Sequence, residues 1–171
     1  MPKLSDDPKE REAEDKCLAD IAEHGLHVLR VFGDDEWPGF VYSVGLYHNF
    51  QIPEIIIVGL KSDLSHVLLN EIAKRARHGE RFELGDTIDG LLDAFAVVLR
   101  PVRDELIEPH FGWDLWYYDG HVFPTAQLIW PTTSGIWPWD PSATDEFRAR
   151  QPLLANAEVP AWARLSKRYD G

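Results

Sequence analysis

The sequence lacks the features that mark several large classes of protein. It contains one cysteine, Cys17, in 171 residues, so no disulfide can form within the chain. Its apolar runs fall short of the roughly 18 residues that a membrane helix needs, and its N-terminal segment is polar and acidic, unlike a signal peptide. We therefore expect a cytoplasmic protein in which Cys17 is a buried, inert thiol.

Basic residues are also scarce. The chain has 17 Lys and Arg against 29 Asp and Glu, for a formal net charge of -12. Such a field repels phosphate groups, so we expect no nucleic-acid partner. The short apolar runs lead us to expect no membrane association either. A solvated acidic surface is the ordinary interpretation. An acidic interface for a basic protein partner is the functional alternative.

Motifs that would announce a catalytic or metal centre are missing. There is no phosphate-binding loop, no glycine-rich dinucleotide fingerprint and no HExxH sequence. Ser43 lies in YSVGL, which is not the nucleophile elbow of hydrolases. The seven histidines have none of the spacings typical of zinc or iron sites. We expect no metal site, and the sequence leaves cofactors and enzymatic activity open.

Hydrophobic periodicity and turn residues predict a single α+β domain. Two adjacent strands around a turn at 34–39 are typical of a hairpin, and the β-branched run at 55–60 is typical of a strand covered on both faces. This order favours a mostly antiparallel sheet or half-open barrel with flanking helices. The expected helices are 8–24, 62–78 with Ser62 as its cap, and 104–120 broken near Pro109; the expected strands are 26–33, 40–47, 55–60, 94–103 and 122–130, with a polar loop at 48–54 and irregular chain at 79–93.

The domain is expected to span residues 1–141. Residues 142–171 are expected to form a C-terminal helix and tail, packed on the domain or extending from it, with Ser142 or Thr144 as the helix cap.

Several short blocks, taken together, carry a family resemblance. They are Pro38 to Leu46, Pro53-Glu54, Gln127 to Pro131 and Pro138-Trp139. In this combination the chain resembles the uncharacterised bacterial domain-of-unknown-function 4262 family, over about Asp15 to Pro141. One departure is Thr132, where the family pattern has an acidic residue. The resemblance implies no activity, because the family has no assigned function.

The stretch QLIWPTTSGIWPWDP, Gln127 to Pro141, holds three tryptophans and three prolines. Large rings fixed by neighbouring prolines are typical of a hydrophobic clasp, which we favour, although the same rings suit the wall of a ligand pocket. If Trp130 and Trp139 are core residues, replacing either with Ala is expected to cost about 3–5 kcal/mol.

Polar and aromatic residues gather at the ends of the predicted elements, where one pocket would bring them together. His48 or His110 is the candidate acid or base, and Tyr47 and Glu54 would orient a ligand. We predict a small-molecule or cofactor-binding domain with an aromatic-lined pocket; the alternative is a non-enzymatic acidic interaction protein, a partner or antidote for a basic protein. The candidate ligand-binding residues are Tyr47, His48, Glu54, His110, Tyr117, Gln127, Trp130 and Trp139.

Overall fold

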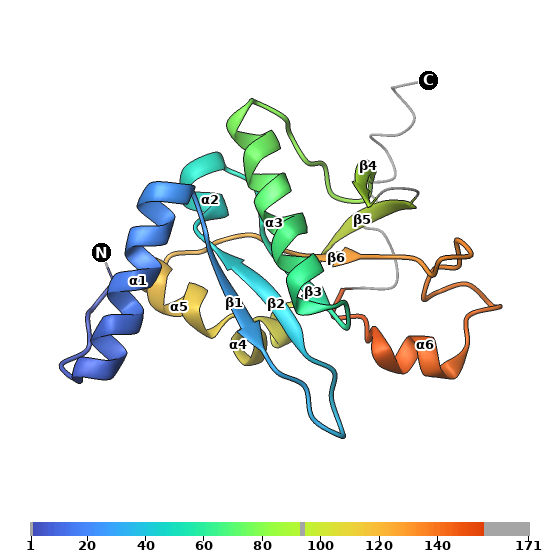
Figure 1. Ribbon diagram of the computed structural model, residues 1–171, viewed down its shortest axis with the longest axis horizontal. Helices are drawn as coiled ribbons and strands as arrows, with labels where there is room; N and C mark the ends of the chain where they lie inside the picture. Colours follow the sequence, from blue (N-terminus) through green and yellow to red (C-terminus); the bar gives the residue numbers. More distant parts are fainter. Residues whose placement is uncertain (1, 93–94, 156–171) are drawn as a thin grey trace.

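The fold is built on one six-stranded sheet with strand order β1-β2-β3-β6-β5-β4 (Figure 1). A computed structural model describes residues 2–92 and 95–155. All neighbouring strands are antiparallel except β3 and β6, which are parallel. The α+β prediction is confirmed as a mostly antiparallel open sheet, with β1 and β4 at its edges rather than closed into a barrel. The strands are β1 (His27–Val31), β2 (Phe40–Val44), β3 (Glu54–Val58), β4 (Thr87–Leu92), β5 (Phe95–Pro101) and β6 (Thr125–Ile129).

Helices cover both faces of this sheet. In Figure 1, α3 crosses the front of the strands while α4 and α5 lie behind them, and α1 runs beside the edge strand β1. The helices are α1 (Pro8–His24), α2 (Leu46–Phe50), α3 (Ser62–Arg77), the 3-10 turn η1 (Asp104–Leu106), α4 (Ile107–His110), α5 (Gly112–Tyr118) and α6 (Asp145–Arg150). Within the described ranges, no helix is long and apolar enough to cross a membrane.

Strand β3 divides the hydrophobic core into two halves. All of its residues are buried. Ile55 and Ile57 pack into the cluster that contains the apolar residues of α3, whereas Ile56 and Val58 pack with Cys17 and the aromatic residues of α5. Side chains alternate between the two faces of a strand. The β-branched run therefore forms a strand covered on both sides, as predicted.

Helix ends are capped at α1 and α6 by side chains, and one predicted cap is absent. The Asp7 carboxylate accepts hydrogen bonds from Lys9 N and Glu10 N at 2.9 and 3.1 Å, and α1 ends at Gly25 with φ 92°. Thr144 caps α6 by accepting from Phe147 N. The cap predicted at Ser62 is wrong, because Ser62 is already helical and Lys61 holds the cap position without a side-chain bond.

Two segments differ from the sequence prediction. The second strand ends at Gly45, whose φ of 109° turns the chain directly into α2, so the expected polar loop begins as a short helix. Residues 87–92 form strand β4 instead of irregular chain. Its glycine, Gly90, has φ 80° and lies where the pairing with β5 shifts register. A glycine at such a shift marks an irregular strand rather than a loop.

Candidate functional site

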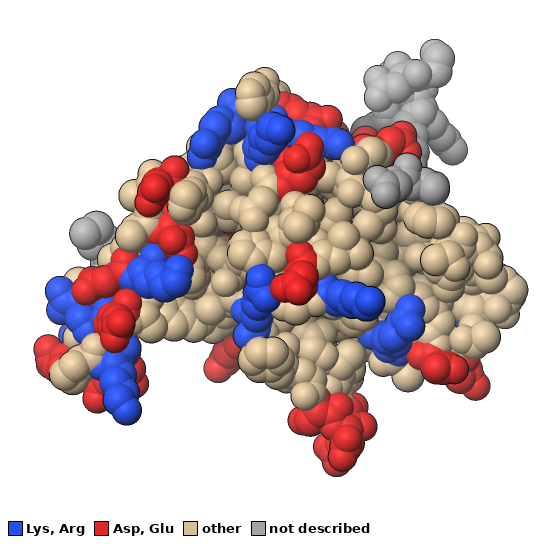
Figure 2. Space-filling view, in the orientation of Figure 1, with Lys and Arg blue, Asp and Glu red and all other residues tan. Residues whose placement is uncertain are grey.

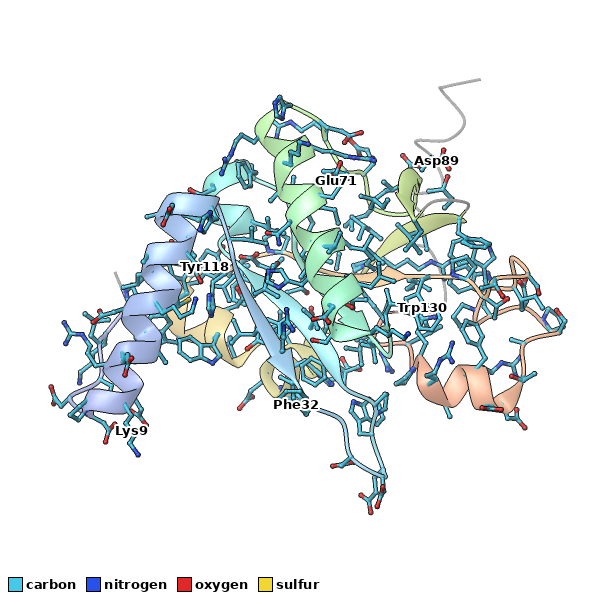
Figure 3. All side chains as sticks on the ribbon, viewed as in Figure 1. Lys9, Phe32, Glu71, Asp89, Tyr118 and Trp130 are labelled. Atoms are coloured by element: carbon cyan, nitrogen blue, oxygen red, sulfur yellow. The ribbon has the colours of Figure 1, made fainter. Side chains whose placement is uncertain are left out.

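Four of the predicted residues meet where β2, α2, β3 and α5 come together. Tyr118 of α5, labelled in Figure 3, lies at the centre of this group, and its hydroxyl donates to Glu54 Oε2 at 2.5 Å. The rings of Tyr47 and Tyr118 are 6.0 Å apart, and the His48 ring lies 5.9 Å from that of Tyr117. The structure thus brings together Tyr47, His48, Glu54 and Tyr117.

Glu54 has no exposed surface, and its carboxyl group is enclosed by donors. Oε1 accepts from the Ser43 hydroxyl at 2.9 Å and from Leu46 N at 3.0 Å, while Oε2 accepts from Gly45 N at 2.8 Å in addition to Tyr118. The left-handed turn at Gly45 aims both backbone N–H groups at the carboxyl group. Burial raises the pKa of Glu54, and these hydrogen bonds only partly oppose that effect.

A second buried carboxyl group, Asp114 of α5, lies next to Glu54. It has no exposed surface, and no N–H or O–H group of the described residues donates to either of its oxygens. Burial, followed by the charge of Glu54 and a hydrogen bond with it, raises the pKa of Asp114 well above its ordinary value. Two adjacent carboxylates without a cation disfavour each other's ionisation, so the structure favours the protonated form of Asp114, which can donate a hydrogen bond to Glu54.

Asp114 and Tyr118 are functional candidates that the sequence analysis missed. They are four residues apart on α5, so both face the same side of that helix. An acidic residue at helical spacing from a buried tyrosine is the signal that could have found them. The break near Pro109 was predicted, but the positions inside the helix that follows it were not assigned to a face.

Cys17 borders the same buried group. Burial, with a smaller contribution from Asp114, raises the pKa of its thiol to about 12. The thiolate that reacts with electrophiles and metals is therefore absent at neutral pH. This agrees with the expected inert cysteine.

The remaining predicted residues lie elsewhere. His110 packs against Phe40, with ring centroids 5.2 Å apart, and its Nδ1 is 2.8 Å from Leu106 O. Gln127 Oε1 accepts from Leu154 N at 2.7 Å and Ala155 N at 3.2 Å, so this side chain ties the C-terminal segment to β6. Neither residue contacts the group around Glu54.

Trp130 and Trp139 belong to the segment that was predicted to be a clasp. Trp130 is buried; its Nε1 donates to Val58 O at 3.0 Å, and its ring meets Phe147 edge-on. Trp139 is half-buried and stacks on Trp137, with centroids 5.1 Å apart. These rings pack in clusters other than the one that contains Tyr118, so the eight candidates do not form one pocket.

A cavity with aromatic walls lies between α1 and α5. Its volume is about 550 Å³. The rings of Trp113 and Trp116 are 5.4 Å apart and inclined at 77° to each other. Neither tryptophan was among the predicted site residues. The lining residues are Lys9, Glu10, Ala13, Glu14, Gly112, Trp113 and Trp116.

A second cavity, of about 410 Å³, lies at the outer edge of β1, between α1 and α3. It is more polar than the first, and it contains three histidines. His27 Nδ1 is 2.7 Å from Asp20 Oδ2, and Lys16 Nζ lies 3.1 Å from the same oxygen. The lining residues are Lys16, Asp20, His24, Leu26, His27, Val28, His66 and Asn70.

The fold and these sites define a single-sheet α+β protein with a buried carboxyl pair and two cavities beside α1. A family model described as "Domain of unknown function (DUF4262)" matches residues 20–144. The chain belongs to this family, as the motif resemblance predicted. Comparison with curated proteins gave no match, and comparison with solved structures gave none.

Proposed function

We propose that the protein is a small-molecule-binding domain and that the cavity between α1 and α5 is its ligand site. One observation carries this proposal: two tryptophan rings stand almost at right angles in a cavity of about 550 Å³. Small-molecule sites are concave, mostly apolar and within roughly 300–1,000 Å³. Trp113 and Trp116 supply the apolar walls that the sequence led us to expect from other aromatic residues.

Charges around these rings favour a cationic organic ligand. Glu10 and Glu14 line the cavity beside the two tryptophans. The face of an indole ring attracts cations, and two such faces with nearby carboxylates are the recurring way to hold a quaternary ammonium group. Lys9, the one basic lining residue, opposes this preference and favours a ligand whose cation lies away from it.

The walls of the cavity are held in place before any ligand arrives. Trp116 Nε1 donates to Lys3 O at 2.9 Å, and Trp113 N donates to the Tyr42 hydroxyl at 3.1 Å. Ser5 N donates to a Glu14 carboxylate oxygen at 2.7 Å. A preformed site loses less conformational entropy on binding, which supports specific recognition.

Binding of benzyltrimethylammonium to the purified chain tests the proposal. We expect saturable quenching of tryptophan fluorescence and a rise in melting temperature, because a ligand that binds only the folded state stabilises it. Trp116→Ala should abolish both responses, and Glu14→Gln should weaken them. The matched neutral probe is 2,2-dimethylpropylbenzene, which has the same shape without the charge.

Trp37→Ala is the control variant, since this tryptophan is 43% exposed and lies outside the cavity. It should bind the cation as the wild type does. Equal responses to the cation and to the neutral probe would contradict the proposed preference for a cationic ligand. Binding that survives Trp116→Ala would place the ligand elsewhere.

The loop between β1 and β2 favours a second candidate function, that of an acidic partner for a basic protein. The loop carries Asp34, Asp35 and Glu36, and Figure 2 shows acidic side chains gathered at its tip. Phe32, labelled in Figure 3 at the end of β1, is 88% exposed. An exposed aromatic ring beside a charged rim is typical of a protein interaction site.

This candidate is tested by recovery of partners from the host at low and high salt. An acidic interface should release its basic partner as the salt concentration rises. Phe32→Ser should prevent capture even at low salt. Capture that depends on neither salt nor Phe32 would contradict the assignment to this loop.

We further infer a bacterial, cytoplasmic protein. The family resemblance supports a bacterial origin. A single cysteine that is buried rather than paired supports a reducing compartment.

A further inference from the structure

We propose that the cavity at the edge of β1 is a general-base site, in which His27 removes a proton from water or a hydroxyl group that adds to a small carbonyl compound. This site is separate from the proposed tryptophan cavity and does not depend on it. The observation behind it is a hydrogen-bonded Asp20–His27 pair in a cavity that also presents His66, Asn70 and Lys16.

The Asp20 carboxylate fixes the protonation of His27. Burial alone raises the pKa of Asp20, but hydrogen bonds from His27 and Lys16 outweigh that effect and hold the pKa below its ordinary value. An ionised carboxylate only accepts hydrogen bonds, so Nδ1 of His27 carries the proton. A ring that carries this single proton has its lone pair on Nε2, the nitrogen that a base needs.

Arg30 fixes His66 in the opposite tautomer, with the ring proton on Nε2. Its Nδ1 is 2.7 Å from Arg30 Nη2, which is always a donor. Burial, followed by the charge of Arg30, lowers the pKa of His66, so its ring is neutral near pH 7. The proton of a neutral ring must then lie on Nε2. The cavity therefore holds one histidine that accepts a proton and another that donates a hydrogen bond.

These two roles match the addition of an oxygen nucleophile to a carbonyl group. The O–H proton of the nucleophile moves to His27 Nε2 as its oxygen bonds to the carbonyl carbon. The carbonyl oxygen gains charge and accepts a hydrogen bond from His66. His27 then returns the proton to that oxygen, so the net reaction is addition across the C=O bond. Asp20 stabilises the transient imidazolium.

The surroundings of His27 suit this chemistry. The charged and titratable groups of the cavity are Lys16, Asp20 and His24 on α1 and His66 on α3. Trp113 of α5 packs against the His27 ring, with centroids 6.3 Å apart. The side chain of His27 is only 13% exposed, so most of the ring is shielded from bulk solvent. Leu26 and Val28 add apolar surface for the carbon atoms of a ligand.

Nitrogen-15 spectra of the histidine rings at neutral pH test the protonation states without any mutation. The expected result is a proton on Nδ1 of His27 and on Nε2 of His66. A proton on Nε2 of His27 would overturn the proposal, because the basic nitrogen would then be occupied.

Reactivity is tested with diethyl pyrocarbonate, a small activated carbonyl compound that modifies unprotonated imidazole nitrogen. Peptide mapping after brief treatment should find His27 modified before His121, an exposed histidine of the chain. Asp20→Asn should lose this preference while the melting temperature shows that the variant is folded. His121→Gln is the matched control and should leave the modification of His27 unchanged. Modification of His27 no faster than that of His121 in the wild type would overturn the proposal.

Discussion

The buried carboxyl pair and the aromatic clasp each place polar side chains in the core. The two sets of side chains satisfy their hydrogen bonds differently. In the clasp, Gln127 donates to Pro152 O and accepts from two backbone N–H groups. Gln151 likewise pairs in both directions with the backbone of Trp130. In the carboxyl pair, Glu54 accepts four hydrogen bonds, whereas no donor among the described residues reaches Asp114. A buried network in which every hydrogen bond is made holds a single rigid structure. A network with an acidic group that lacks a donor can still gain or lose a proton as the pH changes.

The largest loss of stability is expected when Trp130, the central ring of the clasp, is removed. Trp130→Ala is expected to lower the free energy of unfolding by about 3–5 kcal/mol, since it deletes a fully packed ring. It also leaves Val58 O without the indole donor that now reaches it at 3.0 Å. Urea denaturation followed by circular dichroism measures the loss. A change below about 1 kcal/mol would contradict a core role for this ring.

A smaller loss of stability is expected when the carboxyl pair loses the Tyr118 hydroxyl, which donates to Glu54 at 2.5 Å. Tyr118→Phe keeps the ring, which stacks on Phe123 at 4.7 Å, and removes only the hydroxyl that donates to Glu54. A hydrogen bond contributes about 0.5–1.5 kcal/mol between neutral groups and about 1.5–3 kcal/mol to a charged group, so a loss of about 0.5–3 kcal/mol is expected in the same denaturation assay. Tyr117→Phe is the matched control on the neighbouring, half-buried ring, and it should change stability less.

These two regions also show what the sequence could predict. Glu54 was found because it flanks the polar loop after the second predicted strand, and the tryptophans were found because they are large and flanked by prolines. What the sequence could not show is which distant side chain completes each contact. Asp114 is 60 residues from Glu54 along the chain, and only the packing of α5 against the sheet brings them together. The sequence therefore singled out Glu54 and the tryptophans but missed Asp114, and it predicted one pocket where Trp130 and Trp139 pack in clusters separate from that of Tyr118.

The secondary-structure prediction also succeeded for some elements and failed for others. Elements with a strong local signal, such as α1 with its Asp7 cap and Gly25 end, were predicted to within a residue or two. Strand β4 was missed because Gly90 was taken as the sign of a turn, and helix α2 was missed because Gly45 was placed inside the second strand. At Gly45 and Gly90 the left-handed backbone instead turns a strand into a helix or shifts its register.

The outer part of the clasp should matter less than its centre. Trp139→Ala is expected to cost about 1–2.5 kcal/mol, which is the sum of a ring pair with Trp137 and the attraction of Arg100, whose guanidinium lies 3.9 Å from the Trp139 ring centroid. This is smaller than the 3–5 kcal/mol expected from the sequence alone, since the ring is half-buried. Equal costs for Trp130→Ala and Trp139→Ala in parallel urea titrations would contradict this ranking within the clasp.

Asp114→Asn is the change to the carboxyl pair that should alter stability least at low pH. The amide has nearly the same shape as the neutral acid that it replaces. As the pH rises above about 4, Asp114 ionises in the unfolded chain but stays protonated in the folded one. A raised pKa in the folded state means that stability is present at low pH and is lost as the pH rises toward that pKa. Asparagine does not titrate, so the variant should gain on the wild type by up to about 1.4 kcal/mol for each pH unit in this window. Urea titrations of both proteins at pH 4 to 8 measure the difference. A difference that does not change with pH would mean that Asp114 is ionised in the folded protein, and the carboxyl pair would then hold no shared proton.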